Sequence, residues 1–240
     1  MLPNLVSTDT RTVYIIDTFT QNCYIELMSQ AGFIHQGWYH IMNRGLEKRL
    51  TFADEKDCQR FVETIEYYRN KNPPARFSFR KRSTSKQPND NTHGVEVISY
   101  CLMPNHFHLL LRQLEEGIMT TFLSKITNSY TKYFNTKYQR GGPLFVGFKA
   151  SMIESDEQLL HVCRYIHLNP LIEHVVRDLK KFPYSSYLEF LGEKSGFCIK
   201  EEVLRHFTSL QAYETFVLDS QDYQKSIKQM ERLKLEGARS

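Results

Sequence analysis

Residues 95–112, VEVISYCLMPNHFHLLLR, decide the fold, because they read as two apolar strands joined by a tight turn at residues 103–105. Successive side chains on a strand point to opposite faces, so His106 and His108 project from one face. The leucines at 109–111 indicate a strand buried on both faces. Two imidazoles at the start of such a strand need partners, and they predict either half of a metal site or a polar stripe.

The composition is that of a globular protein without a membrane helix. The 240 residues, 41% of them hydrophobic, are enough for one large or two small domains with a buried core. No apolar run approaches the roughly 20 residues that a membrane helix needs, and the first residues lack the pattern of a secretory signal. The 5 cysteines are scattered without a C-x-x-C pair, which favours reduced thiols in the cytoplasm.

Basic residues are concentrated in two stretches that contain no acid, although the net charge is only +4. Residues 69–86 hold seven Lys and Arg, and residues 117–153 hold five more, interleaved with aromatic rings. Cations for phosphates and rings for unstacked bases are typical of a surface that binds single-stranded nucleic acid. The alternative is that these cations solvate helix faces while the rings fill the core.

The periodicity of the remaining chain predicts alternating strands and helices. Besides the hairpin, strands are expected at 37–43, 76–81 and 144–153, with a polar, basic loop at 82–94. Helices are expected from the N-cap Asp54 to about residue 72, at 118–137, and from the capping box of Ser155 and Gln158 to Pro170. This order predicts a ferredoxin-like α+β fold, with helices on one side of an antiparallel sheet.

The helix that opens at Ser155 presents His161, Tyr165 and Asn169 on one face, because they lie four residues apart. This face lies beside the apolar stripe of the helix, and a two-histidine metal site needs at least one more ligand and a nucleophile nearby. Spacing alone does not select Tyr165 among the 14 tyrosines, since Tyr68 and Asn72 have the same interval.

Four sequence blocks resemble one known family. YCLMPNHFHLLL (residues 100–111) resembles the signature of the REP-associated tyrosine transposases, which belong to the insertion-sequence transposases with a histidine–hydrophobic–histidine ("HUH") motif. YHIMNRG (39–45) resembles that family's first strand, YIHLNP (165–170) its catalytic helix, and FPYSSY (182–187) the segment that follows. All four blocks occur in the order that the family shows.

The resemblance implies a function and a set of site residues. Tyr165 matches the nucleophile, and Asn169 matches the polar residue that completes a Mg²⁺ or Mn²⁺ site with His106 and His108. The expected activity is metal-dependent cleavage and rejoining of single-stranded DNA through a 5′-phosphotyrosine, at hairpin-forming repeats. The family shares the ferredoxin-like fold, and a nucleoid-associated protein of the cytoplasm is expected.

The resemblance also suggests a division of the chain and a set of DNA contacts. Residues 1–32 form an arm of unknown role, 33–180 the HUH transposase domain, and 181–240 a helical extension with a final helix near 222–236. The basic residues expected to contact DNA are Arg44, Arg80, Arg82, Arg140, Lys81, Lys125, Lys132 and Lys149. One departure concerns Gly147-Phe148-Lys149, which lacks an Arg that the family usually carries there, so Lys149 would have to substitute.

Two other functions remain open from the sequence. A non-catalytic module on the same fold could bind DNA hairpins or RNA. A metal-dependent hydrolase would need a carboxylate base near the histidines, and none lies on the strand at 106–112. The sequence also leaves open whether the protein is a monomer or a homodimer, and whether Tyr165 acts in its own chain's site. His161 and His167 are not among the ligands that the resemblance implies. His161 is expected to be a solvated helix histidine, with orientation of a phosphate or a proton as the alternative, and His40 a core or sheet-face residue first and a site residue second.

Overall fold

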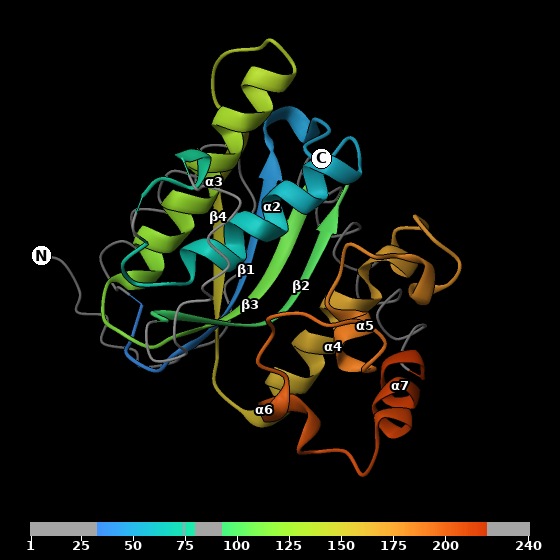
Figure 1. The fold of residues 1–240 in the computed structure, drawn as a ribbon. Helices are drawn as coiled ribbons and strands as arrows, with labels where there is room; N and C mark the ends of the chain where they lie inside the picture. Colours follow the sequence, from blue (N-terminus) through green and yellow to red (C-terminus); the bar gives the residue numbers. More distant parts are fainter. Residues whose placement is uncertain (1–32, 74, 80–92, 220–240) are drawn as a thin grey trace, which may run out of the picture.

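The computed structural model describes residues 33–73, 75–79 and 93–219, so the expected N-terminal arm, most of the basic loop and the final helix lie outside the described residues. It contains a four-stranded sheet in the order β2-β3-β1-β4, in which every neighbouring pair is antiparallel. The strands are β1 (Trp38–Gly45), β2 (Val95–Met103), β3 (His106–Gln113) and β4 (Phe145–Ile153). Figure 1 shows this arrangement, which confirms the predicted ferredoxin-like α+β class.

Helices α2 (Glu55–Tyr68) and α3 (Ile118–Lys137) cover one face of the sheet (Figure 1). Asp54 is the N-cap of α2, as predicted, and its side chain accepts a hydrogen bond from the Asp57 backbone N–H. Asp57 is completely buried and ties the two helices together. Its carboxylate accepts hydrogen bonds from Tyr133 and Tyr138 and from the Lys137 ammonium group.

Helix α4 (Asp156–Ile172) packs on the opposite face, against β2 and β3. The prediction of helices on one side therefore holds for α2 and α3 but not for α4. The reason lies in the central strands, whose second face is also apolar: Ile98, Cys101 and Leu110 are fully buried there. Pro170 does not end α4 as predicted, because a proline in the last turn removes only one helical hydrogen bond.

The segment after α4 packs on the helix and along β2. It contains η4 (Leu179–Lys181), α5 (Tyr187–Phe190), α6 (Glu201–Leu204) and α7 (Leu210–Leu218), which Figure 1 shows gathered beside β2. Backbone hydrogen bonds run from Leu102 N–H to Tyr184 O, from Ser186 N–H to Tyr100 O, and from Ile199 N–H to Val97 O. The predicted division of the chain at residue 180 stays a prediction.

The prediction of a strand at residues 76–81 is wrong for residues 76–79, the part that the structure describes. Phe77–Phe79 form a short 3₁₀ helix, η2. Phe77 is buried, its N–H donates to the Tyr68 hydroxyl, and the Arg60 guanidinium lies 4.1 Å from the centre of its ring. Phe79 instead is 71% exposed. The alternation of aromatic and polar residues was a misleading signal, because tertiary contacts of Phe77 determine the local conformation. No helix in the described parts of the chain is long and apolar enough to cross a membrane.

A buried hydrogen-bonded network joins α4 to the C-terminal segment. His167 is completely buried, with Nδ1 2.7 Å from the Tyr213 hydroxyl and Nε2 2.8 Å from the Ser186 hydroxyl. Burial lowers the pKa of His167 to about 3, so this ring is neutral. A neutral imidazole has one donor and one acceptor nitrogen, and the two hydroxyls satisfy both. His167 is thus a core histidine.

Tyr213→Phe should destabilise the protein by about 1–3 kcal/mol, because it removes a hydroxyl and leaves a buried His167 nitrogen without its partner. Urea unfolding followed by far-ultraviolet circular dichroism measures the free energy of unfolding. Tyr67→Phe is the matched control, since the Tyr67 hydroxyl donates to Ala75 O at an exposed position. If both variants lost the same free energy of unfolding, the His167 network would contribute no more to stability than an exposed hydrogen bond.

Candidate active site

His106 and His108 begin β3 and lie on the face that α4 covers. Their side chains are buried, with residue exposures of 1% and 4%, and their ring centres are 5.0 Å apart at an interplanar angle of 85°. The turn before them is anchored to the rest of the fold. Gly45 N–H donates to Asn105 O at 2.8 Å and Thr51 N–H to Pro104 O at 2.8 Å. This anchoring fixes where the two imidazoles enter the site.

Helix α4 brings Tyr165 beside His108, with Asn169 one turn later on the same helix. The Tyr165 ring lies edge-on to the His108 ring, with centres 5.4 Å apart. Asn169 is completely buried, and its Nδ2 donates to the Tyr165 carbonyl at 2.9 Å. Its Oδ1 is also buried and has no hydrogen-bond partner among the described residues. A buried amide oxygen without a partner costs about 1–3 kcal/mol, so this atom marks a place where something is expected to bind.

The Nδ1 atom of each histidine faces another side chain. His106 Nδ1 lies 2.7 Å from Asn105 Oδ1, while Asn105 Nδ2 is 3.5 Å from Lys48 O. An amide oxygen only accepts, so His106 carries its proton on Nδ1 when neutral and its lone pair on Nε2. His108 Nδ1 lies 2.9 Å from His40 Nε2. This contact can run in either direction, because each ring nitrogen can donate or accept depending on the tautomer.

Two further residues belong to this site: Glu173, which sequence reasoning missed, and His40, for which a site role was only the second expectation. Glu173, the C-cap of α4, has Oε1 4.0 Å from His106 Nε2. Glu173 lies four residues after Asn169, so helical spacing could have placed both on one face. A helix that ends at Pro170 does not include Glu173, so this spacing was not considered. The second is His40, a half-buried residue of β1 whose ring centre is 6.0 Å from that of Tyr165. Burial lowers the pKa of His40 to about 4, so it is neutral at physiological pH.

The donor set fits a divalent cation only if Asn169 takes part. Within the described ranges, no three His, Cys, Asp or Glu side chains are grouped so that they could hold a metal ion. His106, His108 and the Asn169 oxygen are the residues that could do so. Imidazole nitrogens suit Mn²⁺, while an amide oxygen suits Mg²⁺ and Mn²⁺ alike. The buried, unpartnered Asn169 Oδ1 is the observation that favours the fit.

The basic residues expected to contact DNA fall into separate groups. Arg44 is paired with His106 across β1 and β3, and Lys149 is paired with Met42, itself opposite His108. Directly paired residues share a face, so these two cations flank the histidines. Lys125 and Lys132 lie on α3, and Arg140 follows it, so this group is on the side of the sheet away from α4. Arg80, Lys81 and Arg82 lie outside the described residues.

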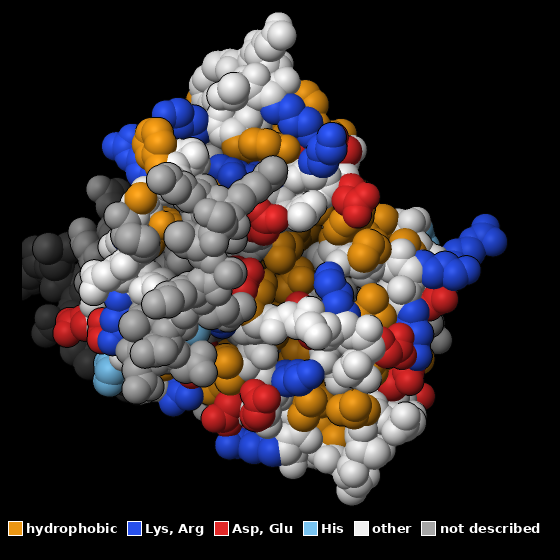
Figure 2. All heavy atoms as spheres, viewed as in Figure 1, with side chains coloured by type: hydrophobic (Ala, Val, Ile, Leu, Met, Phe, Trp, Pro, Cys, Tyr) orange, Lys and Arg blue, Asp and Glu red, His pale blue; other side chains and the backbone are white. Residues whose placement is uncertain are grey.

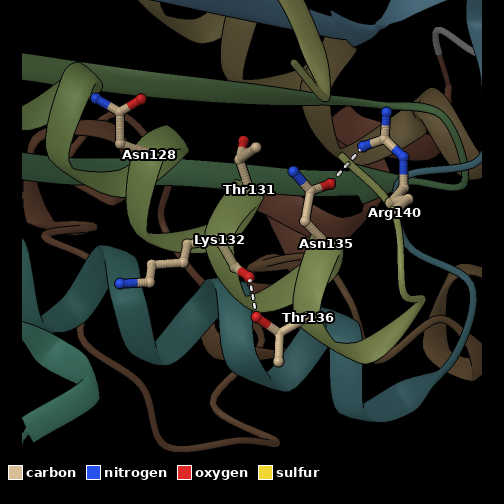
Figure 3. A pocket seen from close by; sticks show the side chains of 6 residues that line it. All are labelled: Asn128, Thr131, Lys132, Asn135, Thr136 and Arg140. Atoms are coloured by element: carbon tan, nitrogen blue, oxygen red, sulfur yellow. Dashed lines mark hydrogen bonds between the residues drawn. The ribbon is translucent and has the colours of Figure 1, made fainter. Parts of the chain in front are cut away.

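The outer side of α3 carries a polar hollow of about 440 Å³. It is lined by Asn128, Thr131, Lys132, Asn135, Thr136 and Arg140, which Figure 3 shows along the helix. Arg140 donates to Asn135 Oδ1 at 2.6 Å and to Pro143 O at 3.1 Å, so its guanidinium holds the turn between α3 and β4. The sheet lies between this hollow and the histidine pair, so the hollow is not part of the candidate site.

Several cations of the two acid-free stretches have protein partners. Arg69 donates to Phe197 O at 2.9 Å, Lys71 pairs with Glu115, and Lys137 pairs with Asp54 and Asp57. On the face drawn in Figure 2, Lys and Arg side chains alternate with Asp and Glu, and apolar side chains line a furrow beside the C-terminal segment. The alternative of solvated or paired cations therefore accounts for part of both stretches.

Comparisons with known proteins agree with this fold and motif order. The family model described as "Transposase IS200 like" matches residues 81–169. A Haemophilus influenzae protein named as a REP-associated tyrosine transposase is 26% identical over 117 residues, 44% of this chain and 66% of that one. The chain thus spans just under two thirds of that relative's length. A solved REP-associated tyrosine transposase bound to a REP hairpin matches with a TM-score of 0.51 and 14% identity, covering 68% of this chain and 88% of that chain.

Proposed function

We propose that this chain, whose predicted resemblance to the REP-associated tyrosine transposases is confirmed, cleaves and rejoins single-stranded DNA through a covalent bond to Tyr165. One observation carries the proposal. Tyr165 lies beside His108, one of two buried histidines on β3, and Asn169, one turn later on α4, has a buried oxygen without a hydrogen-bond partner among the described residues. A nucleophile beside a ready set of metal donors is the arrangement that phosphodiester transfer requires.

His106, His108 and Asn169 would hold a Mg²⁺ or Mn²⁺ ion. Such an ion supplies a Lewis acid for the oxygens of the scissile phosphate. The chain's own contribution is orientation. Asn169 donates Nδ2 to the Tyr165 carbonyl, and this bond turns its Oδ1 away from the helix backbone. The Asn105 and His40 contacts fix the orientation of the two imidazole rings.

The covalent step exchanges one phosphodiester for another. A tyrosine phenol is protonated at neutral pH, so Tyr165 loses its proton as it attacks. Its oxygen bonds to phosphorus, and the bond from phosphorus to the 3′ oxygen of the preceding nucleotide breaks. That oxygen takes up a proton and leaves as a 3′ hydroxyl, while the 5′ phosphate stays on Tyr165. A 3′ hydroxyl of another strand reverses the step, so no ATP is consumed.

The substrate and the stoichiometry are part of the proposal. We expect hairpin-forming repeats, because the structural neighbour is described as bound to a REP hairpin and shares this fold. Arg44 and Lys149 flank the histidines and would contact the phosphates nearest the cleaved bond. Tyr165 lies beside His108 of its own chain, which favours a monomer with a complete site.

A metal-dependent hydrolase is the second candidate, favoured by Glu173. Its carboxylate is 4.0 Å from His106 Nε2 and could activate a water molecule. Glu173→Gln separates the candidates, because it would abolish hydrolysis but leave attack by Tyr165 possible. The third candidate, a non-catalytic module that binds DNA hairpins or RNA, forms no adduct and produces no cleaved strand.

Tyr165→Phe should fold and bind hairpin DNA normally but form no covalent adduct, because only the attacking oxygen is removed. Denaturing electrophoresis of protein incubated with labelled hairpin DNA measures the adduct, and mass spectrometry of the digested adduct locates the DNA. Tyr133→Phe is the matched control and should retain most activity, since its hydroxyl donates to Asp57 between α2 and α3, on the other side of the sheet. DNA attached to any tyrosine other than Tyr165 would overturn the assignment.

Removal of the divalent ion should abolish cleavage. We expect EDTA to stop adduct formation, Mn²⁺ to restore it, and the double variant His106→Ala, His108→Ala to stay inactive. Asn169→Ala should weaken Mn²⁺ binding by at least about tenfold, because even partners outside the ligand shell contribute roughly 10–100-fold. Calorimetric titration with Mn²⁺ measures the affinity. Undiminished activity in EDTA would rule out the metal site.

Arg44→Ala with Lys149→Ala should make DNA binding less sensitive to salt. If each cation meets one phosphate, the slope of log affinity against log salt falls by about 0.7 per contact on a single strand. Fluorescence anisotropy over a salt series measures this slope. Lys180→Ala is the control and should leave it unchanged, because Lys180 is paired with Glu193 and Glu214. An unaltered slope in the double variant would mean that neither cation contacts DNA.

A further inference from the structure

His108 of β3 contacts the side chain of His40 on the neighbouring strand β1. The two nitrogens, His108 Nδ1 and His40 Nε2, are 2.9 Å apart, and the rings are nearly parallel, at an interplanar angle of 16°. An imidazole N–H bond lies in the plane of its ring. A hydrogen bond between these nitrogens is therefore well oriented, with one ring donating and the other accepting.

Only one direction of this hydrogen bond leaves His108 able to bind a cation. If His40 donates, a neutral His108 has its proton on Nε2, where it blocks coordination. If His108 donates from Nδ1, its Nε2 carries the lone pair, and His40 carries its own proton on Nδ1. His106 has the same state for an independent reason, because its Nδ1 faces the amide oxygen of Asn105.

We propose that His40 is a positioning residue that accepts a hydrogen bond from His108 Nδ1–H and thereby presents His108 Nε2 to the metal site. The inference rests on the proposed function and adds a residue of β1 to it. His40 and Asn105 have equivalent roles, one for each histidine of the pair. His40 lies on β1 and Asn105 in the turn before β3, whereas Glu173, the C-cap of α4, lies 4.0 Å from His106 Nε2.

The position of His40 is suited to this role. On β1 it is paired with Leu110 of β3 and Ser151 of β4, so it reaches His108 diagonally across the sheet face. It is half-buried, so a leucine of similar size can replace it without exposing new polar atoms. A glutamine can place its amide oxygen near the position of His40 Nε2 and restore the acceptor.

Two measurements on the full-length protein test the proposal. The first is a long-range proton–nitrogen magnetic resonance spectrum of the isotope-labelled, metal-free protein, with His40→Leu and His108→Ala spectra assigning the two rings. We expect His108 and His40 both to carry the proton on Nδ1. A proton on His108 Nε2 would overturn the proposal, whether or not the protein binds a metal.

The second measurement is Mn²⁺ affinity by calorimetric titration. His40→Leu should bind Mn²⁺ about 10–100-fold more weakly, and His40→Gln should recover most of the loss. His161→Leu is the matched control, because His161 contacts Arg164 and Glu157 rather than the histidine pair. Wild-type affinity in His40→Leu would overturn the positioning role. Absence of Mn²⁺ binding in the wild type would instead remove the metal site, and the spectrum would still decide the role of His40.

Discussion

Strand β3 is buried on both faces, and most of the structure follows from this constraint. Phe107 and Leu109 belong to the core under α2 and α3, whereas Leu110 belongs to the core under α4. The histidines share the α4 face, so they cannot satisfy their nitrogens with bulk water. Every partner must come from the protein or from a ligand, because buried polar groups without partners destabilise a fold. The burial that stabilises the sheet thus also creates the site.

Local signals predicted the elements that carry the site. The hairpin, the bounds of α3 and the N-caps Asp54 and Ser155 agree with the structure. Each depends on residues close in sequence, where alternation, helical spacing and capping act directly. Tyr165 and Asn169 could be placed on one helix face by their interval, but only the family resemblance selected them. The apolar run at 109–111 implied that the second face of the sheet is also covered. No sequence pattern identified α4 as the helix that covers it.

Local sequence patterns could not predict contacts between distant segments. The pairing of His40 with His108 depends on the register of β1 against β3, which no local pattern specifies. Glu173 approaches His106 only because α4 continues past Pro170. The acid-free stretches are a similar case, since Lys137 has no acid near it in sequence but contacts Asp54 and Asp57 in space. Charge patterning along a chain is therefore a weak guide to surface charge.

The hydrogen bonds between β2 and the C-terminal segment have a consequence for the protein's solution behaviour. A strand at the end of a sheet presents unpaired backbone groups that can template pairing with a strand of another molecule. Tyr184, Ser186 and Ile199 occupy those groups along β2. A chain cut before residue 184 would expose backbone donors and acceptors along the apolar strand β2, directly beside the histidine strand. Self-association, rather than a smaller active domain, is the expected fate of such a fragment.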